Sequence, residues 1–172
     1  MYELNLKETF DKARTGDKEA FAQIYSALGQ PVFTVVCRIV QSRELAEDVT
    51  QDIFVKLLIA PPPPSVNNPR AWIFQMAHNA AIDALRKQQR TATDGAELTA
   101  RDAIGSAILR MDLASAIRAL PASEREILSL RINAGLHFHE VATVTGLSVP
   151  AVYRKYRKAI KTLQKLLGGG AL

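Results

Sequence analysis

The sequence is poor in cysteine and in long apolar runs, and each shortage narrows the choice of function. Cys37 is the single cysteine, which excludes an internal disulfide and favours a reducing compartment. No stretch holds the ~18 consecutive apolar residues that a membrane span needs. The charged N-terminal segment MYELNLKETF does not resemble a signal peptide. We therefore expect a soluble, cytoplasmic protein.

Aromatic residues and runs of β-branched residues are also scarce, and this shortage favours helices over strands. The chain has 6 Phe, 4 Tyr and 1 Trp in 172 residues, whereas alanine and leucine dominate its 48% hydrophobic content. Apolar residues recur at helical spacing on both sides of a polar stretch, TATDGAELTARDAIGSA, that lacks such spacing. The sequence predicts an all-α fold: two small helical domains, residues 10–90 and 110–167, joined by a flexible linker at 91–109.

Proline and capping residues predict where some of these helices begin. One helix is expected at 17–28, and Pro31 is expected to open a separate helix that ends near residue 40. Ser123 and Glu126 have the spacing of a capping box for the helix that contains ILSLRI. The four consecutive prolines of APPPPSVNNP predict a stiff extended connector before the last helix of the first domain.

Acidic residues are absent after Glu140, although the final predicted helix, SVPAVYRKYRKAIKTLQKLL, is rich in cations. A short helix, Gly146 and this final helix have the pattern of a helix-turn-helix. A solvated face would explain cations near the helix C-terminus, where the macrodipole favours them. It does not explain Arg154 and Lys155, which lie near the positive N-terminal end. A polyanion such as duplex DNA is the partner that this pattern favours.

The predicted helix ELAEDVTQDIFVKLL is acidic instead. Asp48, Gln51, Asp52 and Val55 follow the i, i+3, i+4, i+7 spacing and are expected to share one face. Three interpretations are open: a solvated face, an interface for a basic protein partner, or a metal site. No histidine accompanies the carboxylates, which disfavours the metal site.

Three segments together resemble one family, the extracytoplasmic-function sigma factors. AEDVTQDIF is similar to the family's polymerase-binding segment, commonly AEDLVQETF, and NPRAWIFQMAHNAAIDALRKQQR to the helix that follows, commonly PRAWLYRIARNLAIDxxRR. LPASEREILSLRINAGLHFHEVATVTGLSVPAV resembles the family's C-terminal helix-turn-helix, LPxxxREVxxLRxxEGLSYxEIAxxLGxSxGTV. The order and spacing match over about residues 10–167. The proline-rich connector is most similar to the iron-uptake (FecI-like) subgroup.

The resemblance implies an alternative sigma factor that directs promoter-specific transcription and catalyses no reaction. Core RNA polymerase would be contacted at the clamp helices of its largest subunit and at its flap; the clamp-helix residues would be Glu47, Asp48, Gln51, Asp52 and Phe54. The minus-ten promoter element would be bound by Ser65, Asn67, Asn68, Arg70, Asn79, Arg86, Lys87 and Arg90. The minus-thirty-five element would be bound by Ser148, Pro150, Tyr153, Arg154, Lys155, Arg157 and Lys158. An anti-sigma factor, with a membrane-linked one among the alternatives, is also implied, and no cofactor, metal or small-molecule substrate is expected.

Several of these residues have an ordinary structural alternative. Asn67 and Asn68 suit an unstacked base, but they are also common turn residues. Arg70 would serve a phosphate or a structural salt bridge. Trp72 would stack on a base or pack in the core. Asp83 is expected to orient a neighbouring arginine of its own helix.

The sequence departs from the family in places that limit what can be transferred. Pro150 and Tyr153 stand in the recognition helix where the family often has Gly and Lys, so base preference does not carry over. His78 replaces a usual arginine, and His137 and His139 are expected to be surface or capping residues. The rival functions are a stand-alone helix-turn-helix regulator that does not bind polymerase, a pure interaction protein and an enzyme. No phosphate loop or nucleophile–base pattern supports the enzyme.

Overall fold

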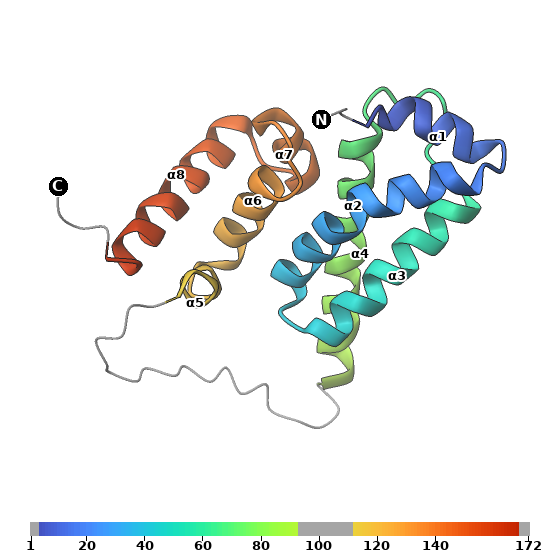
Figure 1. The fold of residues 1–172 in the computed structure, drawn as a ribbon. Helices are drawn as coiled ribbons and strands as arrows, with labels where there is room; N and C mark the ends of the chain where they lie inside the picture. Colours follow the sequence, from blue (N-terminus) through green and yellow to red (C-terminus); the bar gives the residue numbers. More distant parts are fainter. Residues whose placement is uncertain (1–3, 93–111, 169–172) are drawn as a thin grey trace.

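The computed structural model describes residues 4–92 and 112–168, and every regular element in these ranges is a helix. The helices, in chain order, are α1 (Leu6–Arg14), α2 (Lys18–Val40), α3 (Arg43–Ile59), α4 (Pro69–Ala92), α5 (Leu113–Arg118), α6 (Ala122–Ile132), α7 (Phe138–Thr145) and α8 (Val149–Leu166). Figure 1 shows α1–α4, here called the N-terminal unit, on one side and α5–α8, the C-terminal unit, on the other. The all-α prediction is confirmed. Beyond residue 92 the predicted linker lies outside the described residues.

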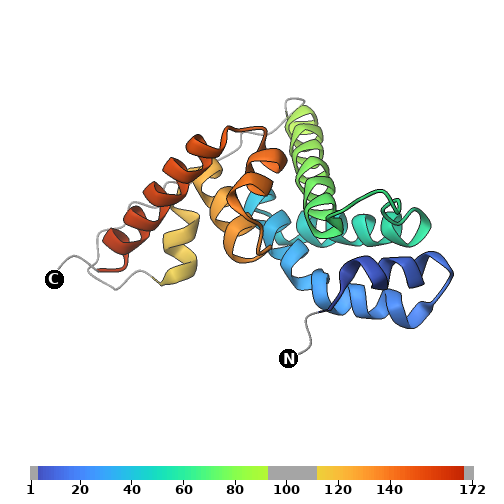
Figure 2. The ribbon, with the colours of Figure 1, turned by 90° about the horizontal axis from the view of Figure 1, so that it is seen from above.

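The two units pack against each other. Helix α2 lies at the centre and contacts α1, α3, α4 and also α6, while α4 contacts α7. In Figure 2 the short α7 lies beside α4, and α8 lies away from the N-terminal unit. One hydrophobic cluster runs through both units and includes Val36 and Ala77 from the first and Ile127, Leu130 and Val144 from the second. The sequence predicted two tethered domains, and the structure shows that they also share a core.

The prediction of two helices around Pro31 is wrong, because α2 continues through this proline. A proline inside a helix lacks a donor and loses one backbone hydrogen bond. Leu28, Val32, Val35 and Val36 lie on both sides of Pro31 and are fully buried. Their burial favours a continuous helix, and it outweighs the cost of the missing bond.

The predicted capping box at Ser123 and Glu126 is also wrong. The N-cap of α6 is Pro121, two residues before Ser123, so the helix begins at Ala122 and no side chain caps it. Both residues make long-range contacts instead: the Ser123 hydroxyl accepts from Lys155, and Glu126 pairs with His78. The observed capping box belongs to α7, where the Glu140 carboxylate accepts from the His137 backbone N–H at 2.6 Å.

Two further features extend the N-terminal unit beyond the sequence prediction. Helix α1 begins at Leu6, before the predicted domain boundary at residue 10, and buries Thr9 and Phe10. Helix α4 continues to Ala92. Among the described helices, α2 is also the one with the length and hydropathy of a membrane span. Its apolar residues, however, form the centre of the core, which accounts for its composition.

Candidate functional surfaces

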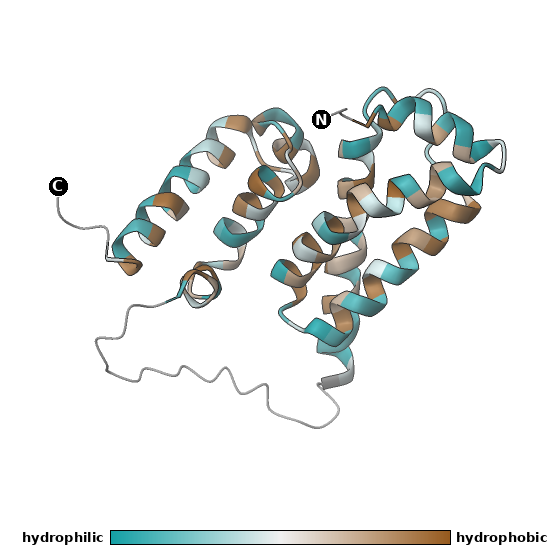
Figure 3. Ribbon diagram, viewed as in Figure 1, coloured by the Kyte–Doolittle hydropathy of each residue, from teal (hydrophilic) through white to brown (hydrophobic). Residues whose placement is uncertain are grey.

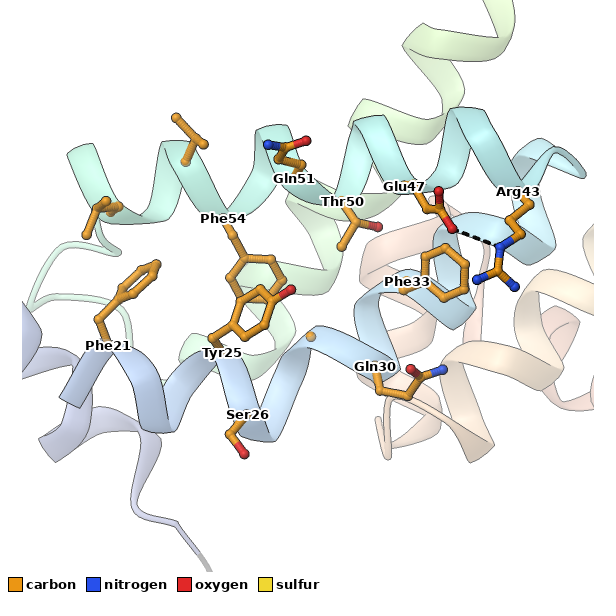
Figure 4. Close-up of a pocket in the computed structure, with 13 residues that line it drawn as sticks. Phe21, Tyr25, Ser26, Gln30, Phe33, Arg43, Glu47, Thr50, Gln51 and Phe54 are labelled. Atoms are coloured by element: carbon orange, nitrogen blue, oxygen red, sulfur yellow. Dashed lines mark hydrogen bonds and ion pairs between the residues drawn. The ribbon is translucent and has the colours of Figure 1, made fainter. Parts of the chain in front are cut away.

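An apolar groove of about 750 Å³ lies between α2 and α3. Tyr25, Val55 and Leu58 line it and are 55%, 47% and 62% exposed, which is unusual for such large apolar side chains. Figure 4 shows Tyr25 of α2 against Phe54 of α3, and their rings meet edge to face with centroids 4.8 Å apart. The groove is therefore a pre-formed apolar surface, and the Tyr25–Phe54 pair forms part of its wall.

Polar groups border this groove on the α3 side. Arg43 donates to Glu47 at 2.8 Å, and both side chains are exposed (Figure 4). Gln51 lies one turn further along and is exposed. The Thr50 hydroxyl is buried in the groove wall and has no hydrogen-bond partner among the described residues. Of the predicted polymerase-binding residues, Glu47, Gln51 and Phe54 thus line one surface.

Asp48 and Asp52 belong to a second, smaller groove, of about 460 Å³, between α3 and α4. Both carboxylates are exposed, and Lys56 and Lys87 line the same groove. The sequence predicted one acidic face on α3 for Asp48, Gln51 and Asp52. The structure places these residues on two sides of α3. Asp48 and Asp52 border the groove between α3 and α4, whereas Gln51 borders the apolar groove between α2 and α3.

The loop before α4 and the first turn of this helix hold Asn68 and Arg70. The Asn68 side-chain oxygen, Oδ1, accepts from the Ala71 N–H at 3.0 Å, so Asn68 caps α4 as turn chemistry predicts. Its amide nitrogen donates to Glu140 of α7. Arg70 donates through Nε to the Ala134 carbonyl at 2.8 Å, a hydrogen bond between the two units in place of the suggested salt bridge.

The other predicted minus-ten residues are exposed. Ser65 and Asn67 lie in the loop, and the rest lie along α4: Asn79, Arg86, Lys87 and Arg90. Asp83 contacts Arg86 at 3.6 Å, as expected for a residue that orients an arginine of its own helix. Trp72 is partly buried and packs against the core beside Met76, which favours the packing role.

The helix-turn-helix consists of α7, a turn at Gly146 and α8. Gly146 has φ 70°, a left-handed conformation that glycine adopts without strain. The Ser148 hydroxyl accepts from the Ala151 N–H at 3.4 Å and caps α8. Figure 3 shows polar and apolar patches alternating along α8, and its buried side holds Val152, Ala159 and Leu163. The predicted elements of the motif are present.

Most cations of α8 face outward, but they are not equally available. Arg154 is exposed and makes no hydrogen bond or ion pair within the described residues. Lys155 is partly buried and donates to the Ser123 hydroxyl at 3.0 Å. Lys158 pairs at 3.0 Å with Glu124, whose side chain is only 4% exposed. Glu124 of α6 thus neutralises the charge of Lys158 from the buried side of α8. Arg154 remains the unpaired cation near the N-terminal end of this helix.

The predicted minus-thirty-five residues at the start of α8 are exposed: Ser148, Pro150, Tyr153 and Arg157. Tyr153 is held by the Phe138 ring, with centroids 5.4 Å apart, and by the Arg157 guanidinium, 5.9 Å from its ring centre. Sequence reasoning missed this cluster, although the aromatic spacing in HFHEV and AVYRKY was visible. His137 and His139 stack with ring centroids 5.8 Å apart, and the described residues hold no group of three metal-ligating side chains.

Arg125 was not singled out from the sequence, yet it joins the two units. It donates to the Arg38 carbonyl at 2.9 Å and to the Arg118 and Leu120 carbonyls at 3.1 and 2.9 Å. Burial and the nearby Arg38 charge both lower the pKa of the Arg125 guanidinium. An arginine pKa is so high that the group remains charged at ordinary pH.

Comparison with known proteins assigns both units to the same protein family. Residues 24–91 match the model described as Sigma-70 region 2, and residues 110–163 match Sigma-70, region 4; together these segments make up well over half of the chain. The chain is 26% identical to the ECF RNA polymerase sigma factor SigK of Mycolicibacterium vanbaalenii, covering 88% of this chain and 84% of that protein. It is 22% identical to SigW of Bacillus subtilis, covering 96% and 98%.

Solved structures support the fold. The sigma factor RpoE of Bartonella quintana, in complex with the anti-sigma factor NepR, matches with a TM-score of 0.69 and 23% identity over 88% of this chain and 98% of that one. CnrH, in complex with the cytosolic domain of CnrY, matches with a TM-score of 0.66 and 24% identity over 96% and 98%. With Sigma-70 regions 2 and 4 both present in order, the chain belongs to the sigma-70 family of sigma factors, and the relatives to which it is similar are extracytoplasmic-function (ECF) sigma factors.

Proposed function

We propose that this cytoplasmic sigma factor binds core RNA polymerase through α3 and reads promoter DNA through α4 and α8. The observation that carries the proposal is the separation of surfaces by charge and polarity. Helix α3 borders an open apolar groove and exposes carboxylates, whereas α8 exposes cations and no acidic residue. A stand-alone regulator has no use on DNA for the first surface.

The apolar groove between α2 and α3 suits an amphipathic helix of the polymerase. Tyr25, Val55 and Leu58 would receive its apolar face, and such exposed apolar patches mark protein interfaces. Glu47, Asp48 and Asp52 would attract its basic residues, and a like charge placed opposite those residues would strongly disfavour binding. The clamp helices of the largest subunit are the occupant that the family resemblance favours.

Charge reversal tests the polymerase contact. We expect Asp48→Lys with Asp52→Lys to abolish co-purification with core RNA polymerase and to leave the circular dichroism spectrum unchanged, because both side chains are exposed. Asp11→Lys with Glu19→Lys makes the same change in net charge outside both grooves and is the matched control. Unchanged binding of the Asp48/Asp52 variant to core enzyme would remove the side of α3 that carries these two aspartates from the interface.

Duplex recognition is assigned to α8, with Arg154 on a phosphate and Tyr153 facing the major groove. The aromatic contacts of Tyr153 restrict its rotamers, which favours a defined base contact. The loop at Ser65–Asn68 and the cations of α4 would hold the melted minus-ten strand. Run-off transcription with purified core enzyme on a genomic promoter library tests both assignments together, and transcription from random sites only would contradict them.

An anti-sigma factor is the expected regulator, and its membrane linkage is part of the proposal. The support is that the structurally similar RpoE is held by an anti-sigma factor in its solved complex. The open α2–α3 groove provides a surface that such a partner would compete for. A pull-down from the native host tests this, and capture of core polymerase alone would contradict it. Membership of the iron-uptake subgroup stays a prediction, tested by whether the regulon responds to iron limitation.

A further inference from the structure

The connector between α3 and α4 contains four consecutive prolines, residues 61–64, which have no backbone N–H to donate. Such a segment cannot attach itself to the fold as a donor, so another group must donate to its carbonyls. Arg14, the last residue of α1, is such a group. Its Nε donates to the Pro62 carbonyl at 3.1 Å, although the two residues are 48 positions apart, and Figure 2 shows the connector beside α1.

The Arg14 guanidinium is itself held in place. Its Nη1 donates at 2.6 Å to the carboxylate of Asp11 on the same helix, and the Arg14 side chain is only 25% exposed. Helix α1, which carries both residues, is anchored in the core by Phe10, which is 1% exposed. Pro62 is buried as well. The hydrogen bond therefore joins two packed parts of the N-terminal unit.

The proposed minus-ten loop, Ser65–Asn68, follows this contact directly and is fixed at its other end too. There Asn68 Oδ1 accepts from the Ala71 N–H at 3.0 Å and caps α4. Between the two anchors, the Val66 N–H donates to the Pro63 carbonyl at 2.9 Å and closes a turn. The prolines of this turn also have a restricted φ. The exposed side chains of the loop are thus presented by a backbone with few conformations left.

We propose that Arg14 is a positioning residue for minus-ten recognition, because it holds the connector at Pro62 and so orders the loop before DNA arrives. This inference rests on the proposed function, since it takes Ser65–Asn68 as the loop that receives an unstacked base. A loop that is ordered in advance avoids the free-energy cost of ordering at the moment of binding. Arg14 acts through the connector and does not itself contact DNA.

The test uses holoenzyme, formed from core RNA polymerase and the full chain, and a single-stranded oligonucleotide with the minus-ten sequence of a promoter identified by run-off transcription. Arg14→Met removes the donor, and we expect the affinity, measured by fluorescence anisotropy, to fall about three- to ten-fold. Lys12→Met makes the same charge change on the same helix and should bind like the wild type, because Lys12 is 58% exposed and pairs with Glu8. Equal affinities of wild type and Arg14→Met would overturn the inference.

Salt dependence separates a positioning role from a direct phosphate contact. If Arg14 contacted a phosphate, its loss would lower the slope of log affinity against log salt by about 0.7, the value for one contact on a single strand. We expect the slope to stay the same, because the guanidinium donates to Pro62 and Asp11. A slope lowered by this amount would overturn the positioning role, whatever the affinity.

A second variant loosens the loop directly. Pro63→Gly removes the restriction on φ at an exposed position and keeps the carbonyl that accepts from Val66. We expect it to weaken oligonucleotide binding about as much as Arg14→Met. The double variant should lose less affinity than the product of the two single losses, because both changes act on the same loop. Losses that multiply would show that Arg14 acts by another route and would overturn the inference.

Two further measurements separate this inference from the proposed function. Holoenzyme with Arg14→Met should bind a minus-thirty-five duplex like the wild type, and a parallel loss there would assign the effect to the whole fold and overturn the inference. If wild-type holoenzyme does not bind the minus-ten oligonucleotide, the proposed minus-ten surface is wrong and the inference fails with it. If wild type and Arg14→Met both bind equally well, the inference alone fails.

Discussion

The two units of this sigma factor differ in how much hydrophobic core each one has of its own. The N-terminal unit has a core centred on α2, with residues such as Ile24 and Phe74 completely buried. The C-terminal unit has only a small cluster of its own, which consists of Ala116, Leu120, Leu128, Ala159 and Leu163. Its remaining buried apolar side chains belong to the core that it shares with the first unit. The difference indicates that the C-terminal unit draws part of its stability from docking.

Truncating a residue of the larger core should have the greatest effect. Phe74→Ala is expected to lower the free energy of unfolding by about 3–5 kcal/mol, because it leaves a cavity in the N-terminal unit. Leu163→Ala, in the small cluster, should cost about 2 kcal/mol, because an 8% exposed site relaxes more easily. Urea denaturation of both variants checks the comparison, and equal losses would contradict it.

Removing Arg125 should affect the junction of the units. Arg125→Met loses three hydrogen bonds to carbonyl groups, and we expect a loss of about 2 kcal/mol together with a larger radius of gyration. Arg118→Met is the control, because Arg118 is exposed, and its cost should stay below about 0.5 kcal/mol. A variant that unfolds at wild-type urea concentrations would show that Arg125 does not stabilise the junction.

A substitution of Arg154 tests whether the unpaired cation of α8 contacts DNA. Arg154→Gln should weaken binding to a minus-thirty-five duplex and lower the slope of log affinity against log salt by about 1, as expected for one lost phosphate contact. Lys165→Gln, in the last turn of α8, has the same charge change and should alter the slope less. Anisotropy titrations at several salt concentrations measure both, and identical slopes would place DNA elsewhere.

The smallest effect is expected at the N-cap of α5. Hydrogen bonds from Ser115 lower the pKa of Asp112 below its ordinary 3.8. The charged cap therefore stabilises α5 fully above this ordinary value, and the stabilisation is lost as pH falls through the lowered pKa. Asp112→Asn should remove this pH dependence, because asparagine caps without titrating. Hydrogen exchange of the Ser115 amide between about pH 5 and pH 2 measures the difference.

The sequence was informative about periodic, amphipathic segments and uninformative about contacts between them. The spacing of apolar residues predicted the start of α3 to within one residue, at Glu44 where the structure has Arg43. The helix start predicted at Pro31 was wrong, because burying the neighbouring apolar side chains contributes more free energy than proline costs inside the helix. The capping prediction at Glu126 failed because its true partner, His78, is distant in the sequence. His78 itself was noticed only as a departure from the family pattern.

The charged surfaces show the same limit. The cations of α8 could be located from the sequence, but Glu124, which neutralises Lys158 from beneath, belongs to another helix. Asp48, Gln51 and Asp52 are close in helical spacing, yet the position of α4 decides which groove each of them borders. Spacing determines which residues share a helix face, whereas packing determines what that face meets.

The unbroken course of α2 through Pro31 has a mechanical consequence. At 1.5 Å per residue its 23 residues make a rod about 35 Å long. Tyr25 lies about two turns into this helix, in the groove proposed for the polymerase, and the Arg38 carbonyl that holds Arg125 lies near the C-terminal end. A protein that binds at Tyr25 is therefore expected to displace the Arg38 carbonyl as well, because no helix end lies between these two residues.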